Sequence, residues 1–343
     1  MTDINTFSTR AMTTSINSIV APDAVIFNKY FKGKGRMSDT DTLEFDVMTG
    51  SQGILPNLSN YAASTVRAKT DRKTVTMKAP RIAEKRHLPA ADQNALRAFG
   101  SQFATERMRD KVAREQMDLY NEFARTWEFQ AVGALKGKIY DSDAKTLLMD
   151  YNLPADHRVT LLTTERFGQT TTSILTTLFR RWQQKIKDDS SSNIVRFEAW
   201  CGSSAYSNIL LNDEILELLA PNRKEATATI GFASNVIKTD IMEYTGSYLN
   251  GNGKTGTRVR YIGDDELIMV GFTNDMFDLP YAPILDLEAP NGVGNVVAGG
   301  RRVPVSSKSW YEKDPSGLWI QGESRQLPVN KRPHNVMVIQ TNG

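Results

Sequence analysis

The sequence predicts an α+β fold, and three observations lead to this prediction. Residues 101–135 contain no proline and are rich in Ala, Glu, Arg, Met, Gln and Leu, a composition that favours one long helix. Apolar and polar residues alternate in 42–48 and again in 74–79, which is the pattern of half-buried strands. Residues 163–300 then mix one helical pattern with several strand-like segments.

Length and composition indicate a folded protein with a substantial core. The chain has 343 residues, of which 40% are hydrophobic and 24% are charged. This length allows two or three domains. No apolar run approaches the roughly 18 residues that a membrane-spanning helix needs, and the first fifteen residues lack the pattern of a signal peptide. We therefore expect no membrane partner and a protein that remains in the compartment where it is made.

The first 36 residues mix Ser, Thr and Asn with isolated apolar residues and end in the glycine-rich segment KGKGR. Because this stretch has no sustained periodicity, we interpret it as an extended arm. The two strands predicted over 42–48 and 74–79 follow it, and they are joined by a long polar connection, residues 50–71. Connections of this length are usually functional or disordered. The pair of strands is therefore predicted to form an excursion that leaves the body of the subunit.

Basic side chains gather in the second half of this excursion, with few acidic residues between them. The strip comprises Arg67, Lys69, Arg72, Lys73, Lys78, Arg81, Lys85 and Arg86. Such a strip either faces solvent or needs an acidic partner surface or a polyanion. The net charge of the whole chain is only +3, which is well short of a dedicated nucleic-acid reader.

The long helix is predicted over 101–135, with its apolar positions at spacings of three and four residues. These positions are Val112, Leu119, Tyr120, Phe123, Trp127, Ala131 and Leu135. A helix of this length extends roughly 50 Å, which suits an extended subunit better than a small globular enzyme. Gly133 and Gly137 are expected to mark its end.

Beyond the long helix, a second amphipathic helix carries Leu178, Phe179, Trp182 and Ile186 on one face. Strands are predicted over 194–200, 244–249, 257–262 and 266–271, and one or two short helices over 205–219. Two late strands are predicted over 317–322 and 335–341. The last of them, VMVIQ, is apolar enough to require a partner strand in a sheet.

The segment GNGKTG, residues 251–256, resembles the end of a nucleotide-binding P-loop. Its spacing is wrong, because the position that requires the first glycine is occupied by Tyr248. The residues that follow are also strand-like, whereas a phosphate site of this type needs the N-terminus of a helix. We interpret the segment as a hairpin turn.

No other pattern predicts catalysis, a metal or a cofactor. The histidines His87, His157 and His334 are far apart, and none has a second His or Cys at the spacing of metal ligands. No GxSxG motif nominates a nucleophilic serine. The single cysteine, Cys201, has no charged neighbour in the chain and is expected to be a buried structural residue.

Three segments together resemble the lambda-like major capsid proteins of tailed bacteriophages, the family called E. These segments are WEFQAVGALKGKIYD at the end of the long helix, RRVPVSSKSWYEKDPSGLWIQGES, and the closing QLPVNKRPHNVMVIQT. Their order and distances extend the resemblance over most of the chain. One departure is His334, which separates Pro333 from Asn335 where the family has Pro-Asn.

The resemblance implies the tailed-phage capsid fold, of the Hong Kong 97 type. It assigns residues 1–36 to an N-terminal arm, 37–88 to an extended E-loop, 89–162 and 301–343 to a peripheral domain with a spine helix, and 163–300 to an axial domain. It also implies hexamers and pentamers of one protein in an icosahedral shell around double-stranded DNA. Portal, scaffold and decoration proteins are further implied partners, with the host cytoplasm and then the virion as location.

From the charged residues of the sequence we predict an ionic contact between neighbouring subunits of the shell. The basic residues of the E-loop would meet acidic residues on the spine helix of a neighbour. The basic set is Arg67, Lys69, Arg72, Lys73, Lys78 and Arg81, and the acidic set is Asp110, Glu115, Asp118 and Glu122. The alternative is a sequence-independent nucleic-acid-binding protein that uses the strip 67–86. Few aromatic residues are available there for stacking on bases, and Tyr61 is the nearest.

Overall fold

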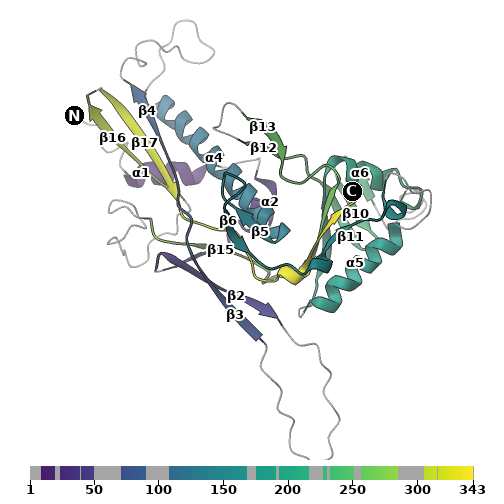
Figure 1. Ribbon diagram of the computed structural model, residues 1–343. Helices are drawn as coiled ribbons and strands as arrows, with labels where there is room; N and C mark the ends of the chain where they lie inside the picture. Colours follow the sequence, from purple (N-terminus) through teal and green to yellow (C-terminus); the bar gives the residue numbers. More distant parts are fainter. Residues whose placement is uncertain are drawn as a thin grey trace, which may run out of the picture. The chain divides into compact units, whose positions relative to one another are not determined.

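The computed structural model describes residues 9–19, 24–38, 40–49, 71–89, 108–167, 175–190, 193–215, 227–229, 232–250, 256–284, 305–314 and 316–342 (Figure 1). The chain divides into two compact units. Unit 1 comprises Met1–Glu44, Thr76–Phe129 and Asp278–Val329, and unit 2 comprises Phe45–Val75, Gln130–Phe277 and Asn330–Gly343. None of the helices in the described part of the chain is both long and apolar enough to cross a membrane.

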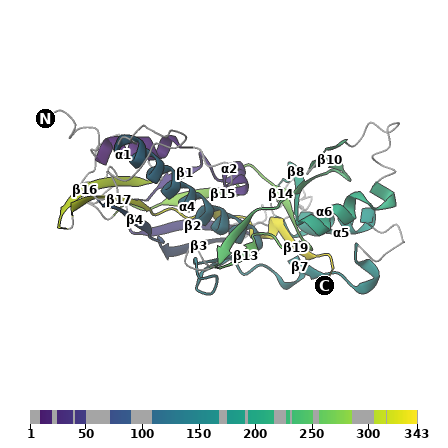
Figure 2. The same ribbon diagram turned by 90° about the horizontal axis from the view of Figure 1, so that it is seen from above.

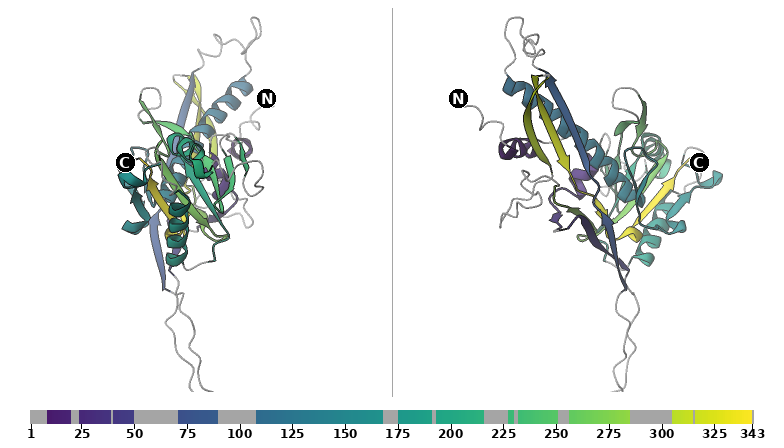
Figure 3. Two further views of the ribbon diagram at one scale, coloured as in Figure 1. Left: turned by 90° about the vertical axis from the view of Figure 1, so that its right-hand side faces the viewer. Right: turned by 60° about the vertical axis from the view of Figure 1, so that its left-hand side comes forward.

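Unit 1 is built on an antiparallel sheet of three strands, in the order β16 (Ser306–Lys313), β17 (Ser316–Ser324) and β4 (Ile82–Pro89). Leu88, Leu318 and Ile320 point to one face of this sheet and are buried there with Met12 and Val112 from two helices. Figure 3 shows the three strands running alongside the long helix. The sheet therefore has one face in the core of unit 1. The predicted strand 317–322 is confirmed.

A second small sheet of three strands has the order β1 (Gly35–Met37), β15 (Phe277–Tyr281) and β18 (Val329–Asn330). β1 and β15 are parallel, and Gly35 lies opposite Leu279. This sheet connects the end of the N-terminal region to a segment more than 200 residues away in the sequence.

The N-terminal region is helical where it is described, so the expectation of an extended arm is wrong for α1 (Thr9–Ser18) and α2 (Val25–Tyr30). Tertiary contacts stabilise both helices, which are too short to be stable alone. In α1, the Thr13 hydroxyl donates to the Ser307 carbonyl oxygen at 3.0 Å, and the Ser307 amide donates back to it at 3.0 Å. In α2, the amides of Ile26 and Phe27 donate to the buried carboxylate of Glu128 at 2.9 and 2.8 Å.

The predicted long helix is confirmed as α4 (Met108–Lys136), while residues 101–107 lie outside the described residues. Of its predicted apolar positions, all but Tyr120 are buried, and Tyr120 is half-buried. The expected end at Gly133 is wrong, because the helix continues through this residue. Gly133 is required there by close packing, since a Cβ atom would lie 2.8 Å from the Lys138 carbonyl oxygen. Gly137, at φ +83°, ends the helix as expected.

The predicted pair of alternating strands is confirmed as β2 (Thr42–Thr49) and β3 (Asp71–Lys78), which form a two-stranded sheet (Figure 1). Leu43 and Phe45 are buried in β2, as their alternation with Thr42 and Glu44 predicts. The polar connection, residues 50–70, lies outside the described residues.

Unit 2 contains a mixed sheet of seven strands. The order is β7 (Arg158–Thr160), β19 (Val336–Gln340), β14 (Glu266–Phe272), β8 (Arg196–Cys201), β11 (Thr239–Glu243), β10 (Phe232–Val236) and β9 (Thr227–Thr229). The predicted strands at 194–200, 266–271 and 335–341 are confirmed as β8, β14 and β19. The prediction that the last strand has a partner in a sheet is confirmed, because β19 pairs with β14 and with β7.

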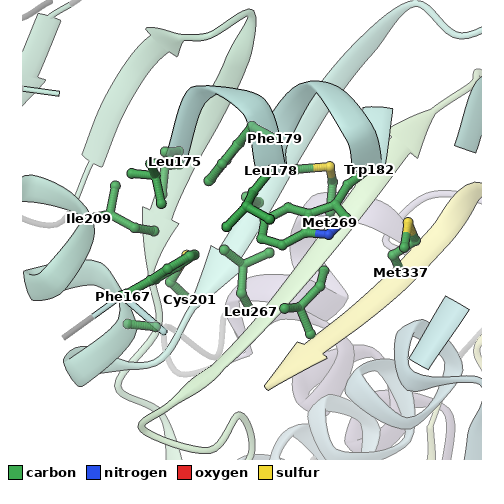
Figure 4. Close-up of a cluster of buried hydrophobic side chains, with 14 of the residues drawn as sticks. Phe167, Leu175, Leu178, Phe179, Trp182, Cys201, Ile209, Leu267, Met269 and Met337 are labelled. Carbon is green, nitrogen blue, oxygen red and sulfur yellow. The ribbon is translucent and has the colours of Figure 1, made fainter. Parts of the chain in front are cut away.

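One face of this sheet is covered by α5 (Leu175–Asp189) and α6 (Ser203–Leu210), as Figure 2 shows. Leu178, Phe179, Trp182 and Ile186 of α5 pack on strand residues such as Met269, which confirms the predicted apolar face (Figure 4). Cys201 is fully buried in the same cluster, as expected, and burial raises the pKa of its thiol.

Two hairpins complete unit 2. β5 (Lys138–Tyr140) pairs with β6 (Leu147–Asp150), and β12 (Ser247–Asn250) pairs with β13 (Thr257–Arg260) in antiparallel fashion. Asn250 lies opposite Thr257, so GNGKTG connects two strands as predicted, although residues 251–255 lie outside the described residues. Three short 3-10 turns occupy Ala155–His157, Thr163–Glu165 and Pro333–Asn335.

Candidate functional site

Three of the predicted basic residues that the structure describes, Lys78, Arg81 and Arg86, lie against carboxylates of the same chain, whereas Lys85 lies over the Trp319 ring. At the start of β2, the main chain of Asp41 accepts a hydrogen bond from the Ala79 amide at 3.1 Å. Its carboxylate lies 3.9 Å from the Lys78 ammonium and accepts a hydrogen bond from the guanidinium of Arg325. Arg325 is only 2% exposed and also donates to the Pro283 carbonyl oxygen at 2.8 Å. A buried guanidinium therefore holds the base of the β2–β3 hairpin within unit 1.

Arg81, in the connection between β3 and β4, forms the second of these pairs. Its guanidinium lies 2.8 Å from Oε2 of Glu323 on β17, and the Glu323 side chain is only 5% exposed. The hydrogen bond from Arg81 to Glu323 raises the pKa of Arg81. This pair supplies the compensating charge that a buried carboxylate requires.

The third cation of the strip, Arg86 on β4, lies among four carboxylates. Three of them are the predicted acidic residues of α4: Nη1 of Arg86 is 3.0 Å from Glu115 and 3.8 Å from Asp118, and Nη2 is 2.8 Å from Glu122. The fourth is Glu84 on β4 itself, 3.5 Å from Nε. Burial opposes the charge of Arg86, but the hydrogen bonds with Glu115 and Glu122 raise its pKa.

The remaining predicted contact residues are only partly described. Arg67 and Lys69 lie outside the described residues, and so do the side chains of Arg72 and Lys73, whose backbone belongs to β3. Asp110 is exposed in the first turn of α4. The inter-subunit role of these residues therefore stays a prediction.

Sequence reasoning brought the acidic residues of α4 together but missed their partner in the same chain. Glu115, Asp118 and Glu122 are spaced by three and four residues, which places them on one face of a helix. Arg86 contacts these carboxylates only in the folded chain. There β4 is held in a sheet by β17, a strand more than 200 residues away in the sequence. No local pattern signals that pairing, and the same is true of Asp41 with Arg325.

These pairs weaken the nucleic-acid alternative. Lys78, Arg81 and Arg86 of the strip all lie within 4.0 Å of carboxylates of their own chain. A polyanion would have to compete with these carboxylates for the same cations.

One cluster in unit 2 has the donor atoms of a metal site. Ligand atoms of Asp156, His157 and Asp189 lie within 4.8 Å of one another. The Lys185 ammonium, however, lies 2.5 Å from Asp156 and 2.8 Å from Asp189, and it lowers the pKa of both carboxyls. His157 is fully buried, with Nδ1 2.8 Å from the Val336 carbonyl oxygen and Nε2 2.7 Å from Asp189. Because a lysine already pairs with both carboxylates, we propose no metal here.

The chain resembles solved capsid proteins in fold. A putative capsid protein of a prophage from E. coli CFT073 matches with a TM-score of 0.64 and 12% identity, covering 96% of this chain and 97% of that one. The capsid protein of cyanophage Pam1 matches with a TM-score of 0.55 and 10% identity, covering 94% and 92%. The capsid protein of cyanophage P-SCSP1u matches with a TM-score of 0.54 and 10% identity, covering 90% and 86%.

These likenesses confirm the predicted tailed-phage capsid fold of the Hong Kong 97 type. No curated protein sequence matches the chain. The family model described as phage major capsid protein E, in contrast, matches residues 8–341. Because this match extends over nearly the whole sequence, the chain belongs to the phage major capsid protein E family.

Proposed function

We propose that this protein assembles into hexamers and pentamers that form an icosahedral phage head around double-stranded DNA. The observation that carries the proposal is the family match over residues 8–341, together with a fold shared with capsid proteins along at least 90% of the chain. The role is structural, without catalysis and without a cofactor. Assembly in the host cytoplasm would precede residence in the virion.

The proposed division of labour follows the family. Residues 37–88 supply the E-loop, 89–162 and 301–343 the peripheral domain, and 163–300 the axial domain, after an arm at 1–36. Two pairings refine this proposal. β4 is a strand of the unit 1 sheet. We therefore propose that β2 and β3, and not β4, belong to the projecting part of the E-loop. β19 belongs to the unit 2 sheet, so the C-terminal segment supports both units.

The proposed contact between subunits remains the basic E-loop on the acidic face of a neighbouring α4. Charge balance supports it: one guanidinium, that of Arg86, faces four carboxylates, which leaves acceptors for further cations. Asp110 adds an exposed carboxylate on the same helix. Each such contact is weak alone, but many contacts per subunit sum to a stable lattice.

Further partners would be the portal, scaffold and decoration proteins, and packaged DNA through contacts without sequence specificity. The net charge of +3 fits this last role. A strongly basic inner wall would bind DNA through counterion release and hinder its exit.

Sedimentation and negative-stain electron microscopy of the purified full chain test the proposal. We expect capsomers or closed shells that form without added nucleic acid. A monodisperse small particle that binds DNA without assembling would instead favour the nucleic-acid alternative.

A further inference from the structure

The contact between β4 and α4 in unit 1 contains more carboxylates than cationic groups. Glu84 and Arg86 come from β4, and Glu115, Asp118 and Glu122 come from α4. Opposite Glu84 and Arg86 on the third element, β17, stand Gly322 and Ile320, which carry no charge. With all its groups ionised, this cluster has four negative charges and one positive charge. Mutual repulsion of the carboxylates would then oppose the attachment of the strand to the helix.

One oxygen of the cluster requires a hydrogen-bond donor that the other ionised groups do not supply. Oε1 of Glu122 lies 2.8 Å from Nη2 of Arg86, whereas Oε2 of Glu122 is buried and has no donor. A buried acceptor without a donor is costly. Glu84 and Glu122 contact the same guanidinium, at 3.5 and 2.8 Å, and a hydrogen bond between them contributes to the raised pKa of Glu84. Two ionised carboxylates are both acceptors and cannot form that hydrogen bond. A proton on Glu84 converts that pair into a donor and an acceptor.

We propose that the Glu84 carboxyl holds a proton that it donates to Glu122, and that this proton makes the attachment of β4 to α4 sensitive to pH. Below neutral pH, the protonated Glu84 donates to Oε2 of Glu122, and Arg86 offsets part of the charge of the three remaining carboxylates. Above neutral pH the proton leaves to solvent. The hydrogen bond is lost, and one more negative charge enters the cluster.

The electrostatics of the site agree with this geometry. Burial, followed by the hydrogen bond with Glu122 and its charge, raises the pKa of Glu84 from 4.5 to about 7, although Arg86 opposes the shift. The folded chain therefore holds this proton up to a higher pH than the unfolded chain does. The resulting stabilisation is complete below pH 4.5, falls as the pH rises toward about 7, and is absent above it.

The effect acts on the N-terminal half of α4. If the protein forms shells as proposed, this proton would make the rigidity of the spine helix in the shell depend on the pH of the medium. The inference itself concerns the single chain, so it is tested on the soluble, unassembled protein and does not depend on whether shells form.

The test compares the thermal midpoint Tm of the wild-type chain with that of Glu84→Gln between pH 4.5 and 8. Gln cannot lose a proton and still donates to Glu122. We expect the Tm of the wild type relative to the variant to fall as the pH rises, with a midpoint near the pKa of about 7. The control Glu312→Gln, which removes an exposed carboxylate of β16 in the same unit, should leave the wild-type profile unchanged.

Hydrogen exchange of the wild-type chain provides a second readout that needs no variant. Peptides from 82–89 and 108–122 should lose protection through the same pH range, after correction for intrinsic exchange, while peptides from α5 keep theirs. A pH-independent difference in Tm between wild type and Glu84→Gln would overturn the proposal. So would equal changes of protection in α4 and α5.

Discussion

At the scale of single residues, hydrogen bonds and ion pairs of buried charged side chains hold distant segments together. Glu128 is fully buried in α4, and its two oxygens accept hydrogen bonds from the first amides of α2. Glu323 forms an ion pair with Arg81, and Asp41 forms one with Arg325. Each pair joins residues more than 100 positions apart, so none of them could be predicted from local sequence.

Glu128→Ala tests the first of these contacts. The change leaves the amides of Ile26 and Phe27 without acceptors in a buried position, and each lost hydrogen bond of this kind costs about 1–3 kcal/mol. We expect the free energy of unfolding, measured with urea, to fall by about 2–5 kcal/mol. The matched control is Glu312→Ala on β16, whose side chain is exposed. An equal loss in both variants would show that Glu128 is not the cap of α2.

At the scale of elements, the sequence predicts those whose periodicity is strong. The buried stripe of α4, the apolar face of α5 and the alternation in β2 are all confirmed. β4 was missed because its buried Leu88 follows a run of polar residues that are exposed or half-buried, Glu84–His87. α1 and α2 were missed because they are short, and contacts with Ser307 and Glu128 stabilise them.

Tyr120→Pro tests the continuity of α4. Proline in a helix interior removes a backbone hydrogen bond and kinks the axis, at a cost of about 3 kcal/mol or more. We expect the soluble protein to be lost, whereas Tyr120→Phe at the same half-buried position should fold. Shells of normal yield from the proline variant would mean that α4 is not one continuous helix.

Lys254→Ala tests the interpretation of the β12–β13 connection as a simple turn. In the described residues, the segment is followed by strand β13 and not by a helix, whose N-terminus a phosphate site of this type needs. We predict no ATP turnover by the wild-type protein, and unchanged assembly by the variant. ATP hydrolysis that disappears with this substitution would contradict the interpretation.

At the scale of the whole molecule, the fold and family could be predicted from the sequence, but the contact surface could not. The order of three segments along the chain was sufficient for the family, because it reflects the whole arrangement of elements. The contact residues depend on which side chains a single subunit leaves unpaired. The structure pairs Lys78, Arg81 and Arg86 within the chain, a property that only the tertiary fold determines.

Reversing the charge of two strip residues, by Arg72→Glu and Lys73→Glu, tests whether the basic strip forms an assembly contact or only faces solvent. At an interface with acidic residues, like charges cost several kcal/mol and suppress the contact. We expect circular dichroism to report a folded chain, while sedimentation shows that shells fail to form. A control reversal at Lys308, on the unit 1 sheet and outside the strip, should leave the shell yield unchanged. Wild-type yield from the double reversal would exclude the assembly role of these two residues.

Cryo-electron microscopy of the particles formed by the purified wild-type chain tests the central claim most directly. The account predicts a closed icosahedral shell of pentamers and hexamers, with β2 and β3 of each subunit lying over α4 of a neighbour. Particles that lack fivefold and sixfold capsomers, or a chain that remains monomeric under all assembly conditions, would contradict it.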